Sequence, residues 1–94
     1  MSTTKPSSNQ KPVQVYSTSY CPYCTRAKNL LSKKGYVFEE IDVSDAPDRR
    51  AWLVKTTGRR TVPQIFIDGN PVGGYDDIAD LDRRGELERL VRGG

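Results

Sequence analysis

The two cysteines, Cys21 and Cys24, are the only ones in the 94-residue chain, and they enclose two residues in the run Cys21-Pro22-Tyr23-Cys24. A short alternating apolar segment precedes this run, and an apolar period of three to four residues follows it, which predicts a strand leading into a helix. Unpaired N–H groups and the positive dipole end of that helix favour the thiolate of Cys21, the reactive form of cysteine. One turn brings Cys24 beside it, and Pro22 suits a first turn that requires no N–H. The pattern predicts thiol–disulfide chemistry.

Two other uses of a cysteine pair stay open at this point. A structural disulfide is typical of secreted proteins, but the sequence shows neither a basic-then-apolar leader nor an apolar run of membrane-spanning length, so we expect a cytoplasmic protein. Half of a zinc or iron–sulfur site needs further ligands. Because the chain has no histidine and no third cysteine, only a dimer or an outside thiol would complete such a site. We therefore expect redox chemistry and no metal.

The length and charge of the chain limit its organisation and its partners. Ninety-four residues form one domain, and the formal charge of +3 comes from basic residues interspersed with acidic ones, as at residues 48–50 and 82–86. This is typical of a solvated surface, so we expect neither a nucleic-acid nor a membrane partner. Residues 1–12 are polar and are expected to form a disordered tail ahead of a domain at residues 13–94.

Hydrophobic periodicity predicts an α/β domain with a four-stranded mixed sheet flanked by helices. Strands are expected at residues 13–16, 36–43 and 64–67, with a short return strand near 71–73 after the hairpin signal Asp68-Gly69. The first helix follows the cysteine run and stops at Gly35, and the second covers residues 47–57 and stops at Gly58. The C-terminal part is helical from about residue 78, with a break near Gly85. We expect Trp52 to pack on the sheet and assign it no chemistry.

Three segments together resemble the signature segments of dithiol glutaredoxins. They are Cys21-Pro22-Tyr23-Cys24, Thr61-Val62-Pro63 and Gly73-Gly74-Tyr75-Asp76-Asp77, in that order and at the matching spacing. The resemblance covers residues 13–91, and residues 61–68 are especially similar to small bacterial glutaredoxins. It implies a thioredoxin-like fold and a glutathione-disulfide oxidoreductase that works in thiol electron transport and cell redox homeostasis. Glutathione is the implied co-substrate, and glutathionylated or disulfide-containing proteins are the implied partners.

The resemblance also implies where glutathione binds. Pro63 is expected in the cis form, which exposes the main chain of Val62 to the cysteinyl unit of glutathione. The backbone of Asp76 and Asp77 is expected to hold the γ-glutamyl carboxylate, and the Asp77 side chain to meet the ammonium group. Gly74 allows the ligand to approach closely.

Four further residues complete the implied binding set. Tyr23 is expected to flank the tripeptide and Arg59 to face its glycine carboxylate, although either residue fits a plain surface role equally well. Thr61 and Tyr75 belong to the same signature segments. The sequence departs from the family at Thr18, where glutaredoxins commonly carry a lysine three residues before the catalytic cysteine. Without that cation, the helix terminus has to stabilise more of the thiolate charge.

The implied mechanism is thiol–disulfide exchange with Cys21 as the nucleophile and Cys24 as the resolving thiol for protein disulfides. Two other classes stay open, both with a related fold. One is a thioredoxin-like redoxin reduced by a flavoprotein reductase, and the other is a dimer that bridges an iron–sulfur cluster with glutathione as a further ligand. Because Pro22 and Tyr23 stand between the cysteines, where cluster-binding relatives more often have small residues, we expect a monomer without a cluster.

Overall fold

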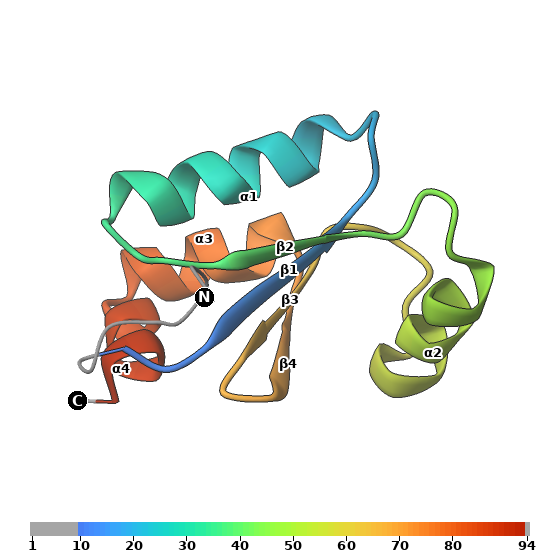
Figure 1. Cartoon of the computed structure of the whole chain (residues 1–94). Helices are drawn as coiled ribbons and strands as arrows, with labels where there is room; N and C mark the ends of the chain where they lie inside the picture. The colour runs from blue at the N-terminus through green and yellow to red at the C-terminus, as the bar shows by residue number, and fades with distance from the viewer. Residues whose placement is uncertain (1–9, 94) are drawn as a thin grey trace, which may run out of the picture.

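The computed structural model describes residues 10–93 of the chain, and the elements follow one another in the predicted order (Figure 1). They are β1 (Val13–Ser17), α1 (Pro22–Lys33), β2 (Glu39–Asp42), α2 (Pro47–Thr57), β3 (Gln64–Ile67), β4 (Asn70–Gly73), α3 (Tyr75–Arg83) and α4 (Glu86–Arg92).

The four strands form one mixed sheet in the order β2-β1-β3-β4, which confirms the predicted architecture. β1 pairs in parallel with β2 and antiparallel with β3, and β3 pairs antiparallel with β4. The hairpin between β3 and β4 turns at Asp68 and Gly69, whose φ angles of 55° and 80° are both positive. Such a two-residue turn matches the twist of the strands and favours glycine at its second position. In this strand order, β1 and β3 each have a neighbouring strand on both sides and form the centre of the sheet.

The second strand is shorter than the sequence predicts, since residues 36–38 and 43 lie outside it. Only residues 39–42 have partners on β1. The Tyr36 N–H instead donates to Leu31 O at 3.0 Å, which closes the end of α1, and the Tyr36 ring is buried in the core. Tyr36 and Phe38 therefore pack in the core before the strand begins, while Val37 is exposed.

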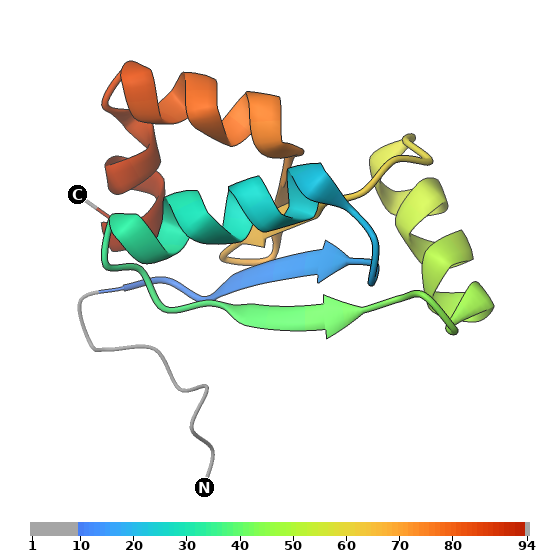
Figure 2. The same cartoon turned by 90° about the horizontal axis from the view of Figure 1, so that it is seen from above.

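The helices bury unequal numbers of apolar residues against the sheet. One side carries the main core, in which buried residues of α1, α3 and α4 pack against the inward side chains of β1 and β3 (Figures 1 and 2). The other cluster is small: Leu53 of α2 packs with Tyr16, Val43 and Phe66. Both views show α2 beyond the end of the sheet where β1 leads into α1. Trp52 stacks on Phe66 as expected for a sheet contact, yet 45% of it stays exposed.

The expected tail lies mostly outside the described residues, and for residues 1–9 it stays a prediction. The three described residues of that segment are bonded to the domain. The Gln10 side chain pairs with both the N–H and the C=O of Val37, and the Lys11 N–H donates to Val91 O. Pro12 O accepts the Asp68 N–H at 2.8 Å. Residues 10–12 therefore lie against the domain in this structure.

Candidate active site around the cysteine pair

Cys21 and Cys24 form a disulfide at the start of α1, where β1 ends. Cys21 is the N-cap residue of the helix, and its sulfur accepts the Cys24 N–H at 3.1 Å. A donated N–H at a helix N-terminus stabilises negative charge on the sulfur once the disulfide is reduced. Cys24 is buried at 1% exposure, whereas Cys21 is only partly buried. The pair thus has an accessible member and a protected one.

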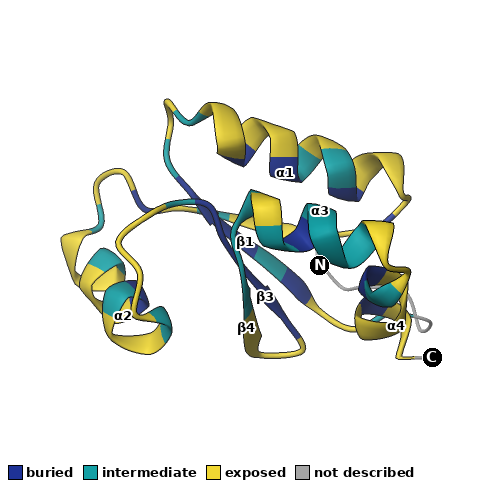
Figure 3. Ribbon diagram, turned by 180° about the vertical axis from the view of Figure 1, so that it is seen from behind, coloured by how far each residue is buried: buried dark blue, intermediate teal, exposed yellow. Residues whose placement is uncertain are grey.

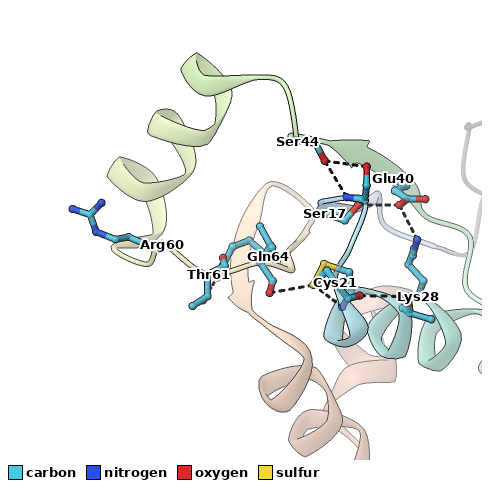
Figure 4. Close-up of a disulfide and its surroundings, with 12 residues drawn as sticks. Ser17, Cys21, Lys28, Glu40, Ser44, Arg60, Thr61 and Gln64 are labelled. Carbon is cyan, nitrogen blue, oxygen red and sulfur yellow. Dashed lines mark hydrogen bonds and ion pairs between the residues drawn. A yellow bond between two sulfur atoms is a disulfide. The ribbon is translucent and has the colours of Figure 1, made fainter.

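The segment Thr61-Val62-Pro63 lies against the accessible sulfur. The Val62–Pro63 peptide bond is cis, which confirms the prediction, and Val62 O lies 3.6 Å from Cys21 Sγ. Behind it, the buried Gln64 side chain donates to Thr61 O at 2.9 Å and fixes the loop from within (Figure 4). The main chain of Val62 is therefore held beside the sulfur that reacts.

The segment from Gly73 to Asp77 forms the N-terminus of α3, and its geometry explains both glycines. The Gly74 N–H donates to Asp77 Oδ2 at 2.9 Å. Gly73 has a φ of 110°, and a Cβ added there would overlap the Asp77 carboxylate. A Cβ at Gly74 would come within 3.2 Å of Pro63 O. The two glycines therefore let the start of α3 close against both its own carboxylate and the cis-proline loop.

Arg59 lines the hollow beside the cysteines and also makes an exposed ion pair with Asp77 that the sequence did not predict. Arg59 Nη1 lies 2.8 Å from Asp77 Oδ2, the same oxygen that accepts the Gly74 N–H. The guanidinium, and after it the Gly74 N–H, holds the pKa of Asp77 below its ordinary value of 3.8, so the carboxylate stays charged at neutral pH. Sequence reasoning missed this pair. The two residues stand 18 positions apart, and no local spacing relates them.

One hollow of about 240 Å³ beside the disulfide gathers every residue that the resemblance assigned to glutathione. Two tyrosines stand at it, with the Tyr23 and Tyr75 ring centroids 6.3 Å apart, and the Arg26 guanidinium lies 5.2 Å from the Tyr23 ring centroid. Their grouping is a fact of the structure, while the role of each in binding stays a prediction. The lining residues are Tyr23, Arg59, Thr61, Val62, Pro63, Gly74, Tyr75, Asp76 and Asp77.

The cations nearest the cysteine run in sequence are engaged elsewhere. Lys28 pairs with Glu40 at 2.8 Å, and the same Glu40 oxygen accepts the buried Ser17 hydroxyl at 2.9 Å (Figure 4). Arg26 lies over the Tyr23 ring. Thr18, in the place of the usual lysine, lines a different hollow. The helix terminus and the Cys24 N–H are therefore the groups placed to stabilise a thiolate at Cys21 once the disulfide is reduced.

Two searches of the described part of the chain concern other kinds of site. Between residues 10 and 93, no three side chains of the His, Cys, Asp and Glu types are grouped so as to hold a metal ion. None of the helices described there has the length and apolar character needed to span a bilayer.

Comparison with known proteins agrees with this geometry. The family model described as Glutaredoxin matches residues 13–72. Glutaredoxin 3 of Escherichia coli (strain K12) is 48% identical over 80 residues, which cover 85% of this chain and 96% of that protein. The solution structure of glutaredoxin from Brucella melitensis superposes with a TM-score of 0.81 at 44% identity, covering 94% of this chain and 97% of that one.

A further solved structure that resembles this chain is a complex with glutathione. The buckwheat glutaredoxin–glutathione complex superposes with a TM-score of 0.81 at 36% identity, covering 86% of this chain and 76% of that one. With the matched family model, the high identity and the cysteine pair at the helix start, these findings agree on fold and chemistry. The chain therefore belongs to the glutaredoxin family, the glutathione-dependent thiol–disulfide oxidoreductases.

Proposed function

We propose that this chain reduces protein–glutathione mixed disulfides and protein disulfides, using glutathione as the electron donor, with Cys21 as the nucleophile and Cys24 as the resolving thiol. The observation that carries the proposal is the asymmetry of the pair beside the hollow. The accessible Cys21 sulfur receives an N–H at the helix terminus, while Cys24 is buried behind it. The sulfur positioned to attack a disulfide is thus the one next to a ready-made binding surface.

With a protein–glutathione mixed disulfide, only Cys21 is required. Its thiolate attacks the glutathione sulfur, the client thiolate leaves and takes up a proton, and Cys21 is left bonded to glutathione. The thiolate of a second glutathione then attacks that glutathione sulfur. Glutathione disulfide leaves, and the Cys21 thiolate is restored. With a protein disulfide, Cys21 forms a mixed disulfide with the client and Cys24 displaces the client thiol. The resulting Cys21–Cys24 disulfide is reduced by two glutathione molecules.

The hollow offers a partner for each end of glutathione. The main chain of Val62, beside the sulfur, pairs with the cysteinyl unit in a strand-like manner. The N–H groups of Asp76 and Asp77 lie in the first turn of α3 and suit the γ-glutamyl carboxylate. In the described part of the chain, the Asp77 hydrogen bonds and ion pair all use Oδ2, which leaves Oδ1 for the ammonium group. Arg59 then supplies positive charge toward the glycine carboxylate from the same rim.

The setting of the reaction follows from its electron donor. A cysteine pair that cycles between dithiol and disulfide needs a reducing glutathione pool, which the cytoplasm provides, so we place the protein there. The catalytic unit in this proposal is the domain at residues 13–94 acting as a monomer, because one chain contributes both cysteines and every residue of the hollow.

The test is glutathione-dependent reduction of a small glutathione mixed disulfide, coupled to glutathione reductase, for wild type, Cys21→Ser and Cys24→Ser. We expect Cys21→Ser to lose all activity and Cys24→Ser to keep most of it, while reduction of a protein disulfide needs both. An inactive wild type would overturn the proposal. Activity that needs a flavoprotein reductase would then indicate a thioredoxin-like redoxin, and a coloured dimer on anaerobic purification would indicate a cluster carrier.

A further inference from the structure

A second hollow adjoins Cys21 and shares no residue with the one assigned to glutathione. Its volume is about 450 Å³, and it lies between the β1–α1 loop, the β2–α2 loop and the first turns of α2. The residues that line it are Thr18, Ser19, Tyr20, Ser44, Asp45 and Arg50. Tyr20, which lines this hollow, directly precedes Cys21 in the chain, so the hollow lies next to the nucleophilic cysteine along the backbone.

The two loops of this second hollow are fastened to each other. The Ser19 N–H donates to Ser44 Oγ at 2.9 Å, and the two serine hydroxyls lie 3.2 Å apart. The Ser44 N–H in turn donates to Asp42 Oδ1 at 2.8 Å. Arg50 donates to Arg60 O at 3.4 Å, so its half-buried side chain reaches from this hollow to the loop that leads into Val62. The surface is therefore built before any partner arrives.

Tyr20 is the most exposed large residue at this place, with 98% of its surface open to solvent. Among the described residues, no aromatic or cationic side chain stacks on its ring. Tyrosine combines a large apolar surface and a polar end with few rotatable bonds, and it is enriched among residues that anchor protein–protein contacts. A ring left open beside the nucleophile is therefore suited to pack on a bound polypeptide.

Charge on this part of the molecule is only partly neutralised by ion pairs. Residues 44–60 carry five basic and two acidic side chains, and of the basic ones only Arg59 has an ion pair among the described residues, with Asp77. Over residues 10–93, the ion pairs employ Lys28, Lys34, Arg59, Arg83, Arg84 and Arg92. Arg49, Arg50, Lys55 and Arg60 form none within that range, and Figure 4 shows Arg60 directed away from the disulfide.

We propose that this second hollow is the client-side subsite, which takes an acidic polypeptide segment adjoining the client's reacting cysteine. Tyr20 packs on that segment, and Arg50 pairs with a carboxylate in it. The inference rests on the proposed function. Glutathione fills the first hollow during the attack, so the client chain has to leave the mixed disulfide over another surface beside Cys21. Asp45 and Arg50 both line the hollow, and the four cations of residues 44–60 without an ion pair in the described range outnumber the two acidic residues there, which selects the acidic character of the segment.

The test compares two glutathionylated peptides that differ only in residues next to the cysteine, acidic in one and neutral in the other, with a small glutathione mixed disulfide as reference. We expect Arg50→Gln to lower kcat/KM for the acidic peptide about fivefold, the size of one partly exposed charge pair, with the loss confined to that peptide. Arg89→Gln is the matched control, since it removes one exposed, unpaired arginine from α4, away from both hollows. We expect no change from it.

Charge reversal and the aromatic ring give two independent checks. Arg50→Glu should lower kcat/KM for the acidic peptide further and raise kcat/KM for a peptide that carries lysine at the same position. Tyr20→Ala should lower kcat/KM for both peptides, chiefly through KM, whereas Tyr20→Phe keeps it. Added salt should reduce the advantage of the acidic peptide in wild type.

The outcomes separate this inference from the proposed function. If Arg50→Gln lowers kcat/KM equally for the acidic peptide, the neutral peptide and the small disulfide, Arg50 supports the catalytic loop and the proposed client subsite is wrong. If no variant changes any peptide, it is wrong as well, while activity on the small disulfide still supports the proposed function. Wild type that fails on the small disulfide overturns the proposed function itself.

Discussion

The three helices α1, α3 and α4 and the helix α2, which lies beyond the end of the sheet, are held to the sheet very differently. α1, α3 and α4 together bury Ala27, Leu31, Ile78, Leu87 and Val91 in one core with β1 and β3. α2 buries a single residue, Leu53, and most of its surface is exposed (Figure 3).

Charge follows the same division. Most of the ion pairs join residues of α1, α3 and α4 to acidic neighbours, whereas α2 itself contributes none within residues 10–93. The part formed by α1, α3 and α4 thus holds most of the buried core and most of the ion pairs, whereas α2 keeps apolar and cationic surface exposed near the cysteines. With the client subsite that we propose beside α2, stability and client recognition would be carried by separate parts of a small domain.

The largest expected effect tests that division with two matched leucines. Leu31 is fully buried in the main core and Leu53 is 2% exposed in the small cluster. We expect Leu31→Ala to lower the free energy of unfolding by about 4 kcal/mol and Leu53→Ala by about 2 kcal/mol, because a lightly packed site collapses around a cavity more readily. Urea denaturation measures both.

Hydrogen exchange sharpens the same comparison. In Leu53→Ala, the amides of α2 should exchange faster while those of β1 and β3 keep their protection, since α2 can open without the main core. Equal losses of stability in the two variants, or a uniform loss of protection in Leu53→Ala, would show that α2 is an integral part of one cooperative core.

The next effect concerns the glutathione hollow, which joins the two regions. Asp77 lies in the first turn of α3 and Arg59 follows α2, so their ion pair joins the main-core helices to the α2 region. Asp77→Asn keeps the shape but removes the charge that we assign to the glutathione ammonium group. We expect KM for glutathione to rise about tenfold, the equivalent of one lost charge-assisted contact. Asp80→Asn, on the same helix but outside the hollow, is the control and should leave KM unchanged.

Steady-state kinetics with varied glutathione measures this change, and thermal unfolding of both variants controls for stability. If Asp77→Asn lowers kcat with KM unchanged, the carboxylate acts on the chemistry at Cys21 and not on ligand binding. A similar rise in KM from Asp80→Asn would attribute the effect to the general field of α3.

Sequence reasoning succeeded where a local pattern carries the information. The period of the first helix, the turn at Asp68 and Gly69, and the bounds of α2 and β3 all agree with the prediction. The cis bond before Pro63 and the grouping of the binding residues came from the resemblance of three spaced segments. In each case, the determining residues stand within a few positions of one another or in a recurring order.

What it missed depends on contacts between distant segments. The start of β2 is set by the register with β1, and Tyr36 serves the end of α1 instead. The pairing of Arg59 with Asp77 arises only when the loop after α2 meets the start of α3. The exposure of Trp52 reflects how α2 leaves the end of the sheet, an angle that no periodicity specifies.

The smallest expected effect concerns the ion pair between β2 and α1, on the side of the sheet that carries the main core. The hydrogen bond from Lys28 lowers the pKa of Glu40 most strongly. Burial raises it and the hydrogen bond from Ser17 lowers it, so that the pKa stays below its ordinary value of 4.5. A lowered folded-state pKa means that Glu40 stabilises the fold above pH 4.5 and loses this contribution as the pH falls below that value. Because the side chain is 42% exposed, water screens the pair, and we expect Glu40→Gln to cost about 0.5 kcal/mol at neutral pH. Urea denaturation of wild type and variant across the acid range should show this difference vanish as Glu40 is protonated, since the other carboxylates titrate alike in both proteins. A difference that stays constant in acid would show that the charge of Glu40 does not cause it, because protonated Glu40 and a glutamine at this position can both accept the Ser17 hydroxyl.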